Sequence, residues 1–161
     1  MLNVLPPSSA PPSRVAWPPI LLAAVIVGSW LLGKYLPLPW PGLGDWPASL
    51  IGFSIGIGGI ALITWAAVTL HKHKTTILPH RSASALVTSG PFAYFRNPVY
   101  LGDVMVLLGL AELTRNVWFV ILAFVFAILI TWLAILPEER HLLVRFGAAY
   151  RDYMKKARRW I

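Results

Sequence analysis

Two groups of polar residues in this chain have the types and spacing to do chemistry. The first is Arg96-Asn97-Pro98, with Tyr100 and Asp103 following at helical spacing. Asn is a preferred N-cap and Pro a preferred first helical residue, so a helix is expected to begin here. Its free N–H groups and the charge of Arg96 would suit a carboxylate or a phosphate. The alternative is an ordinary capped helix with an arginine at the lipid headgroups.

The second group is Glu138-Glu139, at the start of an amphipathic stretch. On a helical projection of residues 138–157, Glu139 falls on the apolar face, whereas Glu138 points aside and is expected to be solvated. The apolar face is formed by Leu142, Phe146, Ala149, Tyr150, Tyr153 and Ala157. A carboxylate on such a face needs a cationic partner, which an arginine or the ammonium group of a ligand would supply.

The composition indicates which elements must position these residues. Of the 161 residues, 57% are hydrophobic and only 12% are charged, whereas a soluble domain carries about a quarter charged residues. The chain is also too short for a separate soluble catalytic module. We therefore expect an all-α integral membrane protein whose active site is built from membrane helices and their loops.

Four membrane helices and one surface helix are expected. The spans are predicted at about 15–36, 47–70, 99–113 and 117–136, and the cytoplasmic amphipathic helix at 138–157. Pro137 is expected to end the last span, because proline breaks the helical hydrogen bonding. Residues 1–14 are rich in proline and are expected to form a flexible tail, so that 15–161 is a single membrane domain. A cleavable signal peptide fits poorly, because the first span is too long and lacks a charged start.

The glycines of the second span predict close packing against another helix. Gly52, Gly56 and Gly59 recur at spacings of four and three residues and so lie on one side of the helix. Such a strip lets two helix backbones approach closely inside a membrane.

The distribution of positive charge predicts the orientation. Four spans would put the N-terminus, the long connection 71–97 and the C-terminus on one side of the membrane. That side would hold Arg14, Lys72, Lys74, Arg81, Arg96, Arg140, Arg145, Arg151, Lys155, Lys156, Arg158 and Arg159. Only Lys34 and Arg115 would lie on the other side. By the positive-inside rule, the long connection and both termini are expected in the cytoplasm.

Inside an apolar span, Asp103 is costly unless it faces a cavity or a partner, so a functional role is expected. It would otherwise be hydrated near the interface or paired with a basic side chain. The net charge of +8 fits the bilayer surface, and no nucleic-acid partner is expected. The chain has no cysteine, and the lysines beside His71 and His73 would repel a divalent cation, so no metal site is expected.

The segment Leu86 to Gly102 resembles the central motif of the isoprenylcysteine carboxyl methyltransferase family, L-V-T-x-G-x-Y-x-x-x-R-[HN]-P-x-Y-x-G. The end of the chain resembles the second half of that signature, E-E-x-x-L-x-x-x-F-G-x-x-Y-x-x-Y with a closing basic segment. It carries Glu138-Glu139, Leu142, Phe146-Gly147, Tyr150, Tyr153 and Arg159-Trp160-Ile161. The resemblance covers about Lys74 to Ile161.

This resemblance implies an integral membrane methyltransferase that uses S-adenosylmethionine on the cytoplasmic side. Carried over residue by residue, it implies a cofactor site made of Leu86, Val87, Thr88 and Gly90 along the adenosine, Arg96, Asn97 and Tyr100 in the pocket, Glu139 at the polar end, and Arg159 closing the site. The acceptor would be a lipidic or small apolar molecule that enters from the bilayer. Arg96, Tyr100 and Asp103 are the groups expected to orient its reacting atom. Asn97 stands where the eukaryotic branch carries a histidine.

Other functions remain open. A phospholipid or amine N-methyltransferase, or a thiol S-methyltransferase, would share this core and cofactor. Membrane sterol reductases carry a related R-H-x-N-Y-x-G-D segment and bind a nicotinamide cofactor, and Tyr100 to Asp103 fits its ending. Val99 argues against a sterol reductase, because it stands where the reductases carry Asn. A non-catalytic scaffold would explain the packing glycines but not Glu139 on an apolar face.

Overall fold

The computed structural model describes residues 17–41, 46–73 and 86–161. Its helices are α1 (Trp17–Tyr35), α2 (Trp46–Lys72), α3 (Pro98–Thr114), α4 (Val117–Ile130), α5 (Leu136–Phe146) and α6 (Ala148–Lys156). Two further turns are η1 (Gly90–Ala93), a 3-10 turn, and η2 (Thr131–Ile135), which is π-helical. The expected tail, 1–14, and part of the long connection, 74–85, lie outside the described residues.

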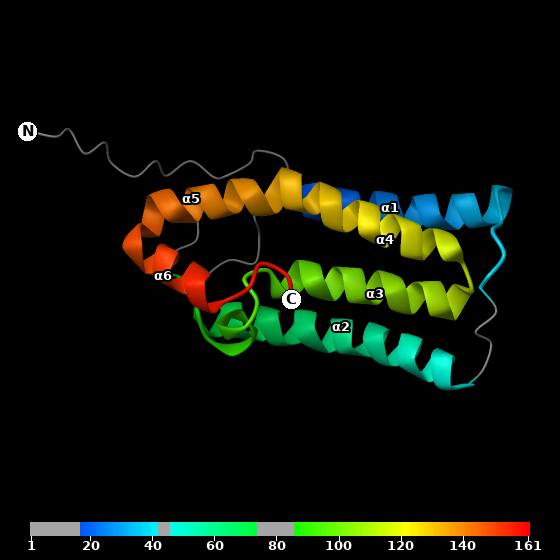
Figure 1. Ribbon diagram of the computed structural model, residues 1–161, viewed down its shortest axis with the longest axis horizontal. Coiled ribbons are helices and arrows are strands. Elements are labelled where there is room, and N and C mark those ends of the chain that lie inside the picture. Colours follow the sequence, from blue (N-terminus) through cyan, green and yellow to red (C-terminus); the bar gives the residue numbers. More distant parts are fainter. Residues whose placement is uncertain (1–16, 42–45, 74–85) are drawn as a thin grey trace, which may run out of the picture.

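The helices α1 to α4 run side by side along the length of the molecule (Figure 1). The α3–α4 hairpin is central, because α2 packs against α3 and α1 packs against α4. At one end, α5 continues the direction of α4, and α6 folds back across that end. The C-terminal residues then run past the start of α3 (Figure 1), so the two halves of the sequence signature meet at the same end.

Three helical segments are long and apolar enough to cross a membrane. They are Trp17–Tyr35, Trp46–Lys72 and Val117–Phe146. Over the described residues, the expected helical fold is thus confirmed, with three helices suited to crossing a membrane. α3 has 17 residues, a length of roughly 26 Å, and carries Asp103 and Glu112.

Glycines hold α2 and α3 close together, as their spacing predicts. A Cβ atom on Gly56 would lie 2.9 Å from the Cα of Gly109, and one on Gly59 would lie 2.7 Å from the carbonyl oxygen of Gly102. Real Cβ atoms do not approach backbone this closely, so a larger side chain at either site would push the helices apart. The predicted close contact is confirmed.

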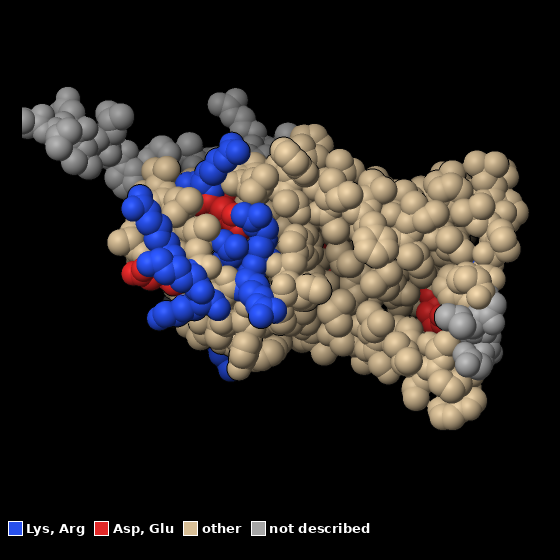
Figure 2. Space-filling model, viewed as in Figure 1, with Lys and Arg blue, Asp and Glu red and all other residues tan. Residues whose placement is uncertain are grey.

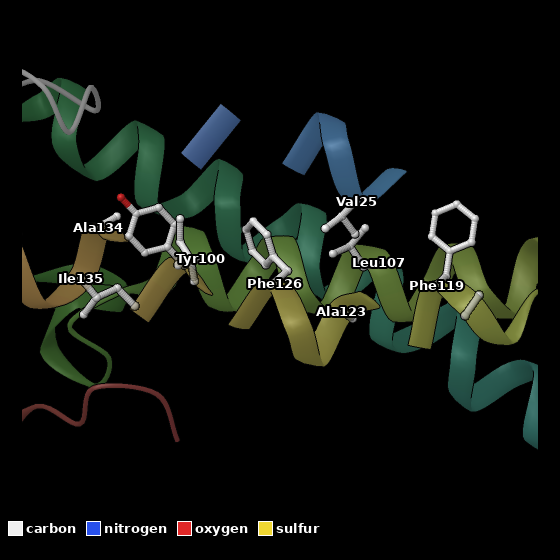
Figure 3. Close-up of a cluster of buried hydrophobic side chains, with 10 residues drawn as sticks. Val25, Tyr100, Leu107, Phe119, Ala123, Phe126, Ala134 and Ile135 are labelled. Carbon is white, nitrogen blue, oxygen red and sulfur yellow. The ribbon is translucent and has the colours of Figure 1, made fainter. Parts of the chain in front are cut away.

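The α3–α4 hairpin turns where the sequence predicts, at Thr114 to Asn116. Arg115 has a φ of 51° and so reverses the chain, and the Asn116 side chain caps α4 by accepting a hydrogen bond from the backbone N–H of Trp118 at 3.0 Å. Between the hairpin and α1 lies the main apolar core, in which Leu107 and Phe126 are fully buried (Figure 3). This core fixes the end of the hairpin that carries the functional residues.

The prediction that Pro137 ends the last span is wrong. The helix continues from α4 through η2 into α5, and Pro137 lies in the first turn of α5. In η2 the N–H of Leu136 donates to the carbonyl of Thr131, five residues back. This wider turn leaves room for the proline ring, which would clash in a regular α-helix. The 30 residues of Val117–Phe146 extend roughly 45 Å, well beyond a hydrocarbon core of about 30 Å.

The predicted helix over 138–157 is broken at Gly147. This residue has a φ of 54°, which glycine adopts without strain, and it separates α5 from α6. The break changes the helical projection. Tyr150 and Tyr153 are buried as expected, whereas Ala149, predicted on the same face, is exposed.

Candidate active site

The chain after α6 lies across the start of α3. We call residues 157–161 the strap. The backbone N–H of Arg96 donates to the carbonyl of Arg158 at 2.7 Å, and the N–H of Arg158 donates to the carbonyl of Tyr94 at 2.9 Å. These bonds form a short parallel bridge between Phe95 and Arg158. Backbone hydrogen bonds therefore hold the strap in place, in addition to the contacts that its side chains make.

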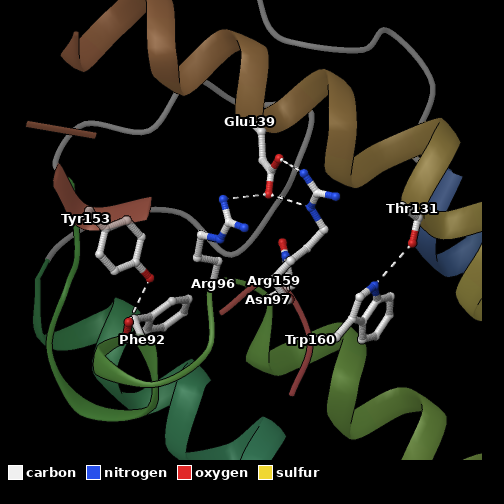
Figure 4. Close-up of polar contacts among 8 residues, drawn as sticks. All are labelled: Phe92, Arg96, Asn97, Thr131, Glu139, Tyr153, Arg159 and Trp160. Carbon is white, nitrogen blue, oxygen red and sulfur yellow. Dashed lines mark hydrogen bonds and ion pairs between the residues drawn. The ribbon is translucent and has the colours of Figure 1, made fainter. Parts of the chain in front are cut away.

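Glu139 lies between two arginines at the centre of the site (Figure 4). Arg159 approaches it in a bidentate way, with Nε at 3.0 Å from Oε1 and Nη2 at 2.8 Å from Oε2. On the other side, Nη1 of Arg96 lies 3.1 Å from Oε1. The Glu139 side chain is only 7% exposed. We call these three residues the ion cluster, and it confirms the prediction that Glu139 needs a cationic partner.

Arg96 has donor capacity that the ion cluster does not use. Its Nε atom is buried and has no hydrogen-bond partner among the described residues, and its Nη1 atom is close to Glu139 without hydrogen-bond alignment. The Arg96 side chain is 11% exposed. Because a buried guanidinium without partners is costly, these atoms suit an anionic group such as a carboxylate.

Asn97 occupies the predicted N-cap position, but its side chain does not cap α3. The helix begins at Pro98, as predicted, and no side-chain capping bond is present. Instead, the Asn97 Nδ2 atom donates to the carbonyl of Arg159 at 3.0 Å. The asparagine therefore fastens the strap next to the ion cluster.

The prediction that Glu138 is solvated is wrong. The hydroxyl of Tyr100 donates to Glu138 Oε1 at 2.9 Å, and both side chains are largely enclosed. The cause is the continuous α4–α5 helix, which keeps Glu138 and Glu139 within the body of the molecule. Two neighbouring carboxylates are thus held differently, Glu139 by arginines and Glu138 by a phenol.

Tyr150 and Tyr153 bring α6 against the site. The Tyr153 hydroxyl donates to the carbonyl of Phe92 in η1 at 2.7 Å. Burial and the nearby Glu139 carboxylate raise the pKa of Tyr150 to about 12, although Arg96 acts in the opposite direction. Burial also raises the pKa of Tyr153. Both hydroxyls therefore remain protonated near neutral pH.

The loop expected to run along the adenosine lies at the same end of the molecule. Leu86 packs against the cluster around Tyr150 and Tyr153, and Val87 is buried, whereas Thr88 is exposed. Gly90 has a φ of 61° and lies against Thr69, so that a Cβ there would be 2.7 Å from the Thr69 hydroxyl. This contact sets the position of the loop on the end of α2.

Asp103 lies outside this arrangement. It is one turn beyond Tyr100 on α3, is half-buried, and makes no hydrogen bond or ion pair with any other residue that the structure describes. The structure thus brings Arg96, Asn97, Glu139 and Arg159 into direct contact, with Tyr100 beside them through Glu138. It does not connect Asp103 to them.

Sequence reasoning gave no role to Trp160 and Thr131, which close one side of the site. The indole Nε1 atom of Trp160 donates to the Thr131 hydroxyl at 3.3 Å (Figure 4). Trp160 also packs against the main core. Thr131 is the first residue of η2, and no residue pattern in the sequence predicts this π-helical turn.

The fold and the ion cluster define a membrane protein with an enclosed polar site at one end of its helices. Comparison with known families gives the class. Residues 48–149 match the family model described as phospholipid methyltransferase, which covers more than half of the chain. The chain belongs to the phospholipid methyltransferase family, the family of membrane methyltransferases to which its sequence motifs point.

Two curated proteins are similar to this chain. The nickel-cobalt-cadmium resistance protein NccN of Alcaligenes xylosoxydans xylosoxydans is 29% identical over 108 residues, which cover 64% of this chain and 46% of that protein. The cobalt-zinc-cadmium resistance protein CzcN of Cupriavidus metallidurans is 29% identical over 121 residues, or 72% of this chain and 50% of that protein. The chain therefore spans about half the length of these relatives. No solved structure matches it.

Proposed function

We propose that this protein transfers a methyl group from S-adenosylmethionine to a lipidic or small apolar acceptor at the membrane. The observation that carries this proposal is the ion cluster. It joins the Arg96 and Glu139 ends of the two sequence motifs at 3.1 Å, where a single ligand would touch both. Membership of a methyltransferase family supports the reaction type.

The residues present fit the cofactor. S-adenosylmethionine carries a carboxylate, an ammonium group, ribose hydroxyls and an adenine ring. The unpaired donors of Arg96 fit the carboxylate, and Glu139 is an acceptor for the ammonium group. In this proposal Leu86, Val87, Thr88 and Gly90 lie along the adenosine, and Asn97 and Arg159 close the site. When bound, the cofactor would supply a methyl group activated by a positively charged sulfur, which leaves as a neutral thioether when a nucleophile bonds to the methyl carbon.

The protein's own contribution is orientation, exclusion of water and handling of a proton. Arg96 and Tyr100 would orient the reacting atom of the acceptor, and the strap would keep water away. Asp103, with no partner among the described residues, would contact the acceptor from further along α3. An amine acceptor must lose a proton, and Glu138, which has no cationic partner in the described part of the chain, would take it.

The proposed orientation has four spans, with the termini and the cofactor site in the cytoplasm. α3 is shorter than its neighbours, but it lies alongside α2 and α4, so membrane thinning or the polar interface would accommodate its ends. The described cations support this direction. Those of α5, α6 and the strap lie at the end with the ion cluster, whereas Lys34 and Arg115 lie at the other end.

The acceptor class has alternatives that the same core would serve. They are an isoprenylcysteine-like carboxylate, a phospholipid or other amine, and a thiol. A sterol-reductase-like oxidoreductase using a nicotinamide cofactor is the alternative from another class, and its main support, Asp103, lies outside the ion cluster. The names of the two relatives concern metal resistance. Methylation of a membrane component could serve such resistance without metal binding by this chain.

We expect the purified protein, in detergent or nanodiscs, to bind S-adenosylmethionine and its demethylated product. Calorimetry with each ligand and with NADPH tests this expectation. Heat with NADPH alone would favour the reductase. Incubation with radiolabelled methyl donor and a host lipid extract then identifies the acceptor, because label should appear in one lipid fraction.

A further inference from the structure

The outer side of α6 is strongly basic. Arg151, Lys155 and Lys156 of α6 and Arg158 of the strap are exposed, and we call these four residues the basic face. The opposite side of α6, with Tyr150 and Tyr153, is buried. The single acid on α6, Asp152, is exposed and pairs with Lys155 at 2.8 Å. Three cations of the basic face therefore make no ion pair with any described carboxylate.

The basic face lies where the apolar helices end. Figure 2 shows the cationic side chains gathered at the end of the molecule that carries α5, α6 and the strap, while the rest of the face in view is almost free of them. Along the helices, apolar side chains such as Ile57, Ile60 and Trp65 of α2 are exposed and would contact lipid tails. Once these helices are embedded, the basic face lies at the level of the lipid headgroups.

We propose that the basic face binds the headgroups of anionic phospholipids and thereby holds the strap over the ion cluster. The charge complementarity is direct, because the inner surface of a membrane that contains anionic lipids attracts nearby Lys and Arg side chains. The link to the strap is covalent and short. α6 ends at Lys156, and Arg158 belongs both to the basic face and to the backbone bridge beside Arg96.

The effect on the cofactor rests on the proposed function, but binding of lipid does not. Arg159 is 38% exposed and is the outermost member of the ion cluster. If α6 is held on the headgroups, the strap loses less freedom when a ligand binds beneath it. Cofactor binding is therefore expected to be tighter in an anionic membrane than in a neutral one.

The full chain lacks cysteine, so Ala149→Cys, at an exposed site on α6, accepts a single environment-sensitive fluorophore. The labelled protein is reconstituted in phosphatidylcholine nanodiscs with increasing proportions of phosphatidylglycerol. The emission is expected to shift as phosphatidylglycerol increases, and high salt should reverse the shift, because it screens exposed charges. The cofactor Kd, measured in the same nanodiscs, is expected to fall.

Charge variants give the decisive comparison. Lys156→Gln should raise the proportion of phosphatidylglycerol needed for half of the shift, by about fivefold at low salt. Lys34→Gln removes the same charge from an exposed site at the opposite end and should change nothing. Asp152→Asn frees Lys155 and should lower the proportion needed.

The experiment tests lipid binding by the basic face and the coupling of that binding to the strap separately. Emission that does not depend on phosphatidylglycerol, or equal effects of the two lysine variants, would overturn the proposal; such a basic face would suit a nucleic acid or an acidic protein instead. A lipid-dependent shift with an unchanged cofactor Kd would overturn the coupling to the strap. Absence of cofactor binding in every membrane would count against the proposed function, and the emission shift would still decide whether lipid binds.

Discussion

Arg96 and Arg159 hold the same carboxylate but differ in how they are anchored. Arg96 is 11% exposed and its backbone is fixed by the strap, whereas Arg159 is 38% exposed and reaches Glu139 from the strap itself. Hydrogen bonding to Glu139 raises the pKa of Arg159, so this cation stays charged at any working pH. Arg96 is thus the more enclosed partner of Glu139, and Arg159 is the more exposed partner that closes the site.

The hydrogen bond between Tyr100 and Glu138 is a second contact between single residues that can be tested. It involves a carboxylate that the sequence predicted to be solvated. Tyr100→Phe removes the hydroxyl that donates to Glu138 at 2.9 Å and leaves an enclosed carboxylate without that donor. Loss of such a bond costs roughly 1–3 kcal/mol of stability. We expect a modest fall in melting temperature and a larger fall in kcat.

Asp103→Asn is the comparison, because Asp103 lies one turn further along α3 and makes no described polar contact. It should lower kcat with little change in melting temperature. Failure of both variants to fold would assign both residues to structure. Folded variants with an unchanged kcat would show that neither residue acts on the acceptor.

Among the elements, the α2–α3 contact positions the functional residues of α3 along the bundle. Gly56→Ala would force a Cβ to within 2.9 Å of the Gly109 backbone. Backbone cannot move aside as a flexible side chain does, so we expect a loss of about 1–3 kcal/mol, seen as a lower melting temperature. The cofactor Kd of the folded fraction should also rise, because Tyr100 lies in the first turn of α3 and Arg96 directly precedes its N-cap.

Gly28→Ala on α1 is the matched control for this prediction. There the new Cβ would lie 3.5 Å from a Leu122 methyl carbon, an ordinary contact. Alanine also favours a helix over glycine, so stability should be unchanged or slightly higher. An equal fall in melting temperature in both variants would contradict the expectation that the α2–α3 contact excludes a side chain at Gly56.

The sequence predicted those elements whose causes are local. Helix positions, the α3–α4 turn and the glycine contact follow from apolar length, capping residues and spacing within one segment. The course of the chain around Pro137 did not follow, because the π-helical turn that precedes the proline has no local sequence signal. Gly147 appeared only as a motif letter, and its positive φ decides which side of α6 is buried.

The candidate site was predictable to a similar degree. The buried position of Glu139 follows from the apolar face of its helix, and its contact with Arg96 follows from the two linked motifs. The placement of Glu138 could not be predicted, because it depends on Tyr100 of another helix. Likewise, the bonds from Asn97 to the strap and from Trp160 to Thr131 join parts of the chain that local patterns do not relate.

The whole molecule has two polar ends separated by an apolar body. At the end opposite the site, Glu112 is buried, with 8% of its side chain exposed, and pairs with Arg115 at 3.1 Å. Arg115 also donates to the Ser49 hydroxyl at 2.8 Å. Among the described residues, Glu112 and Glu139 thus have similar burial and are each paired with arginine, but of these two only Glu139 stands where the sequence motifs meet.

The most direct measurement is therefore the Kd of S-adenosylmethionine for the native protein, Glu139→Gln and Glu112→Gln, determined by calorimetry in the same nanodiscs. Melting temperatures show which variants remain folded. We expect Glu139→Gln to weaken binding by about tenfold or more, the equivalent of one charged hydrogen bond. Glu112→Gln should lower stability and leave the Kd of the folded protein unchanged. Equal Kd values in all three proteins, or no binding by any of them, would contradict a cofactor site at the ion cluster.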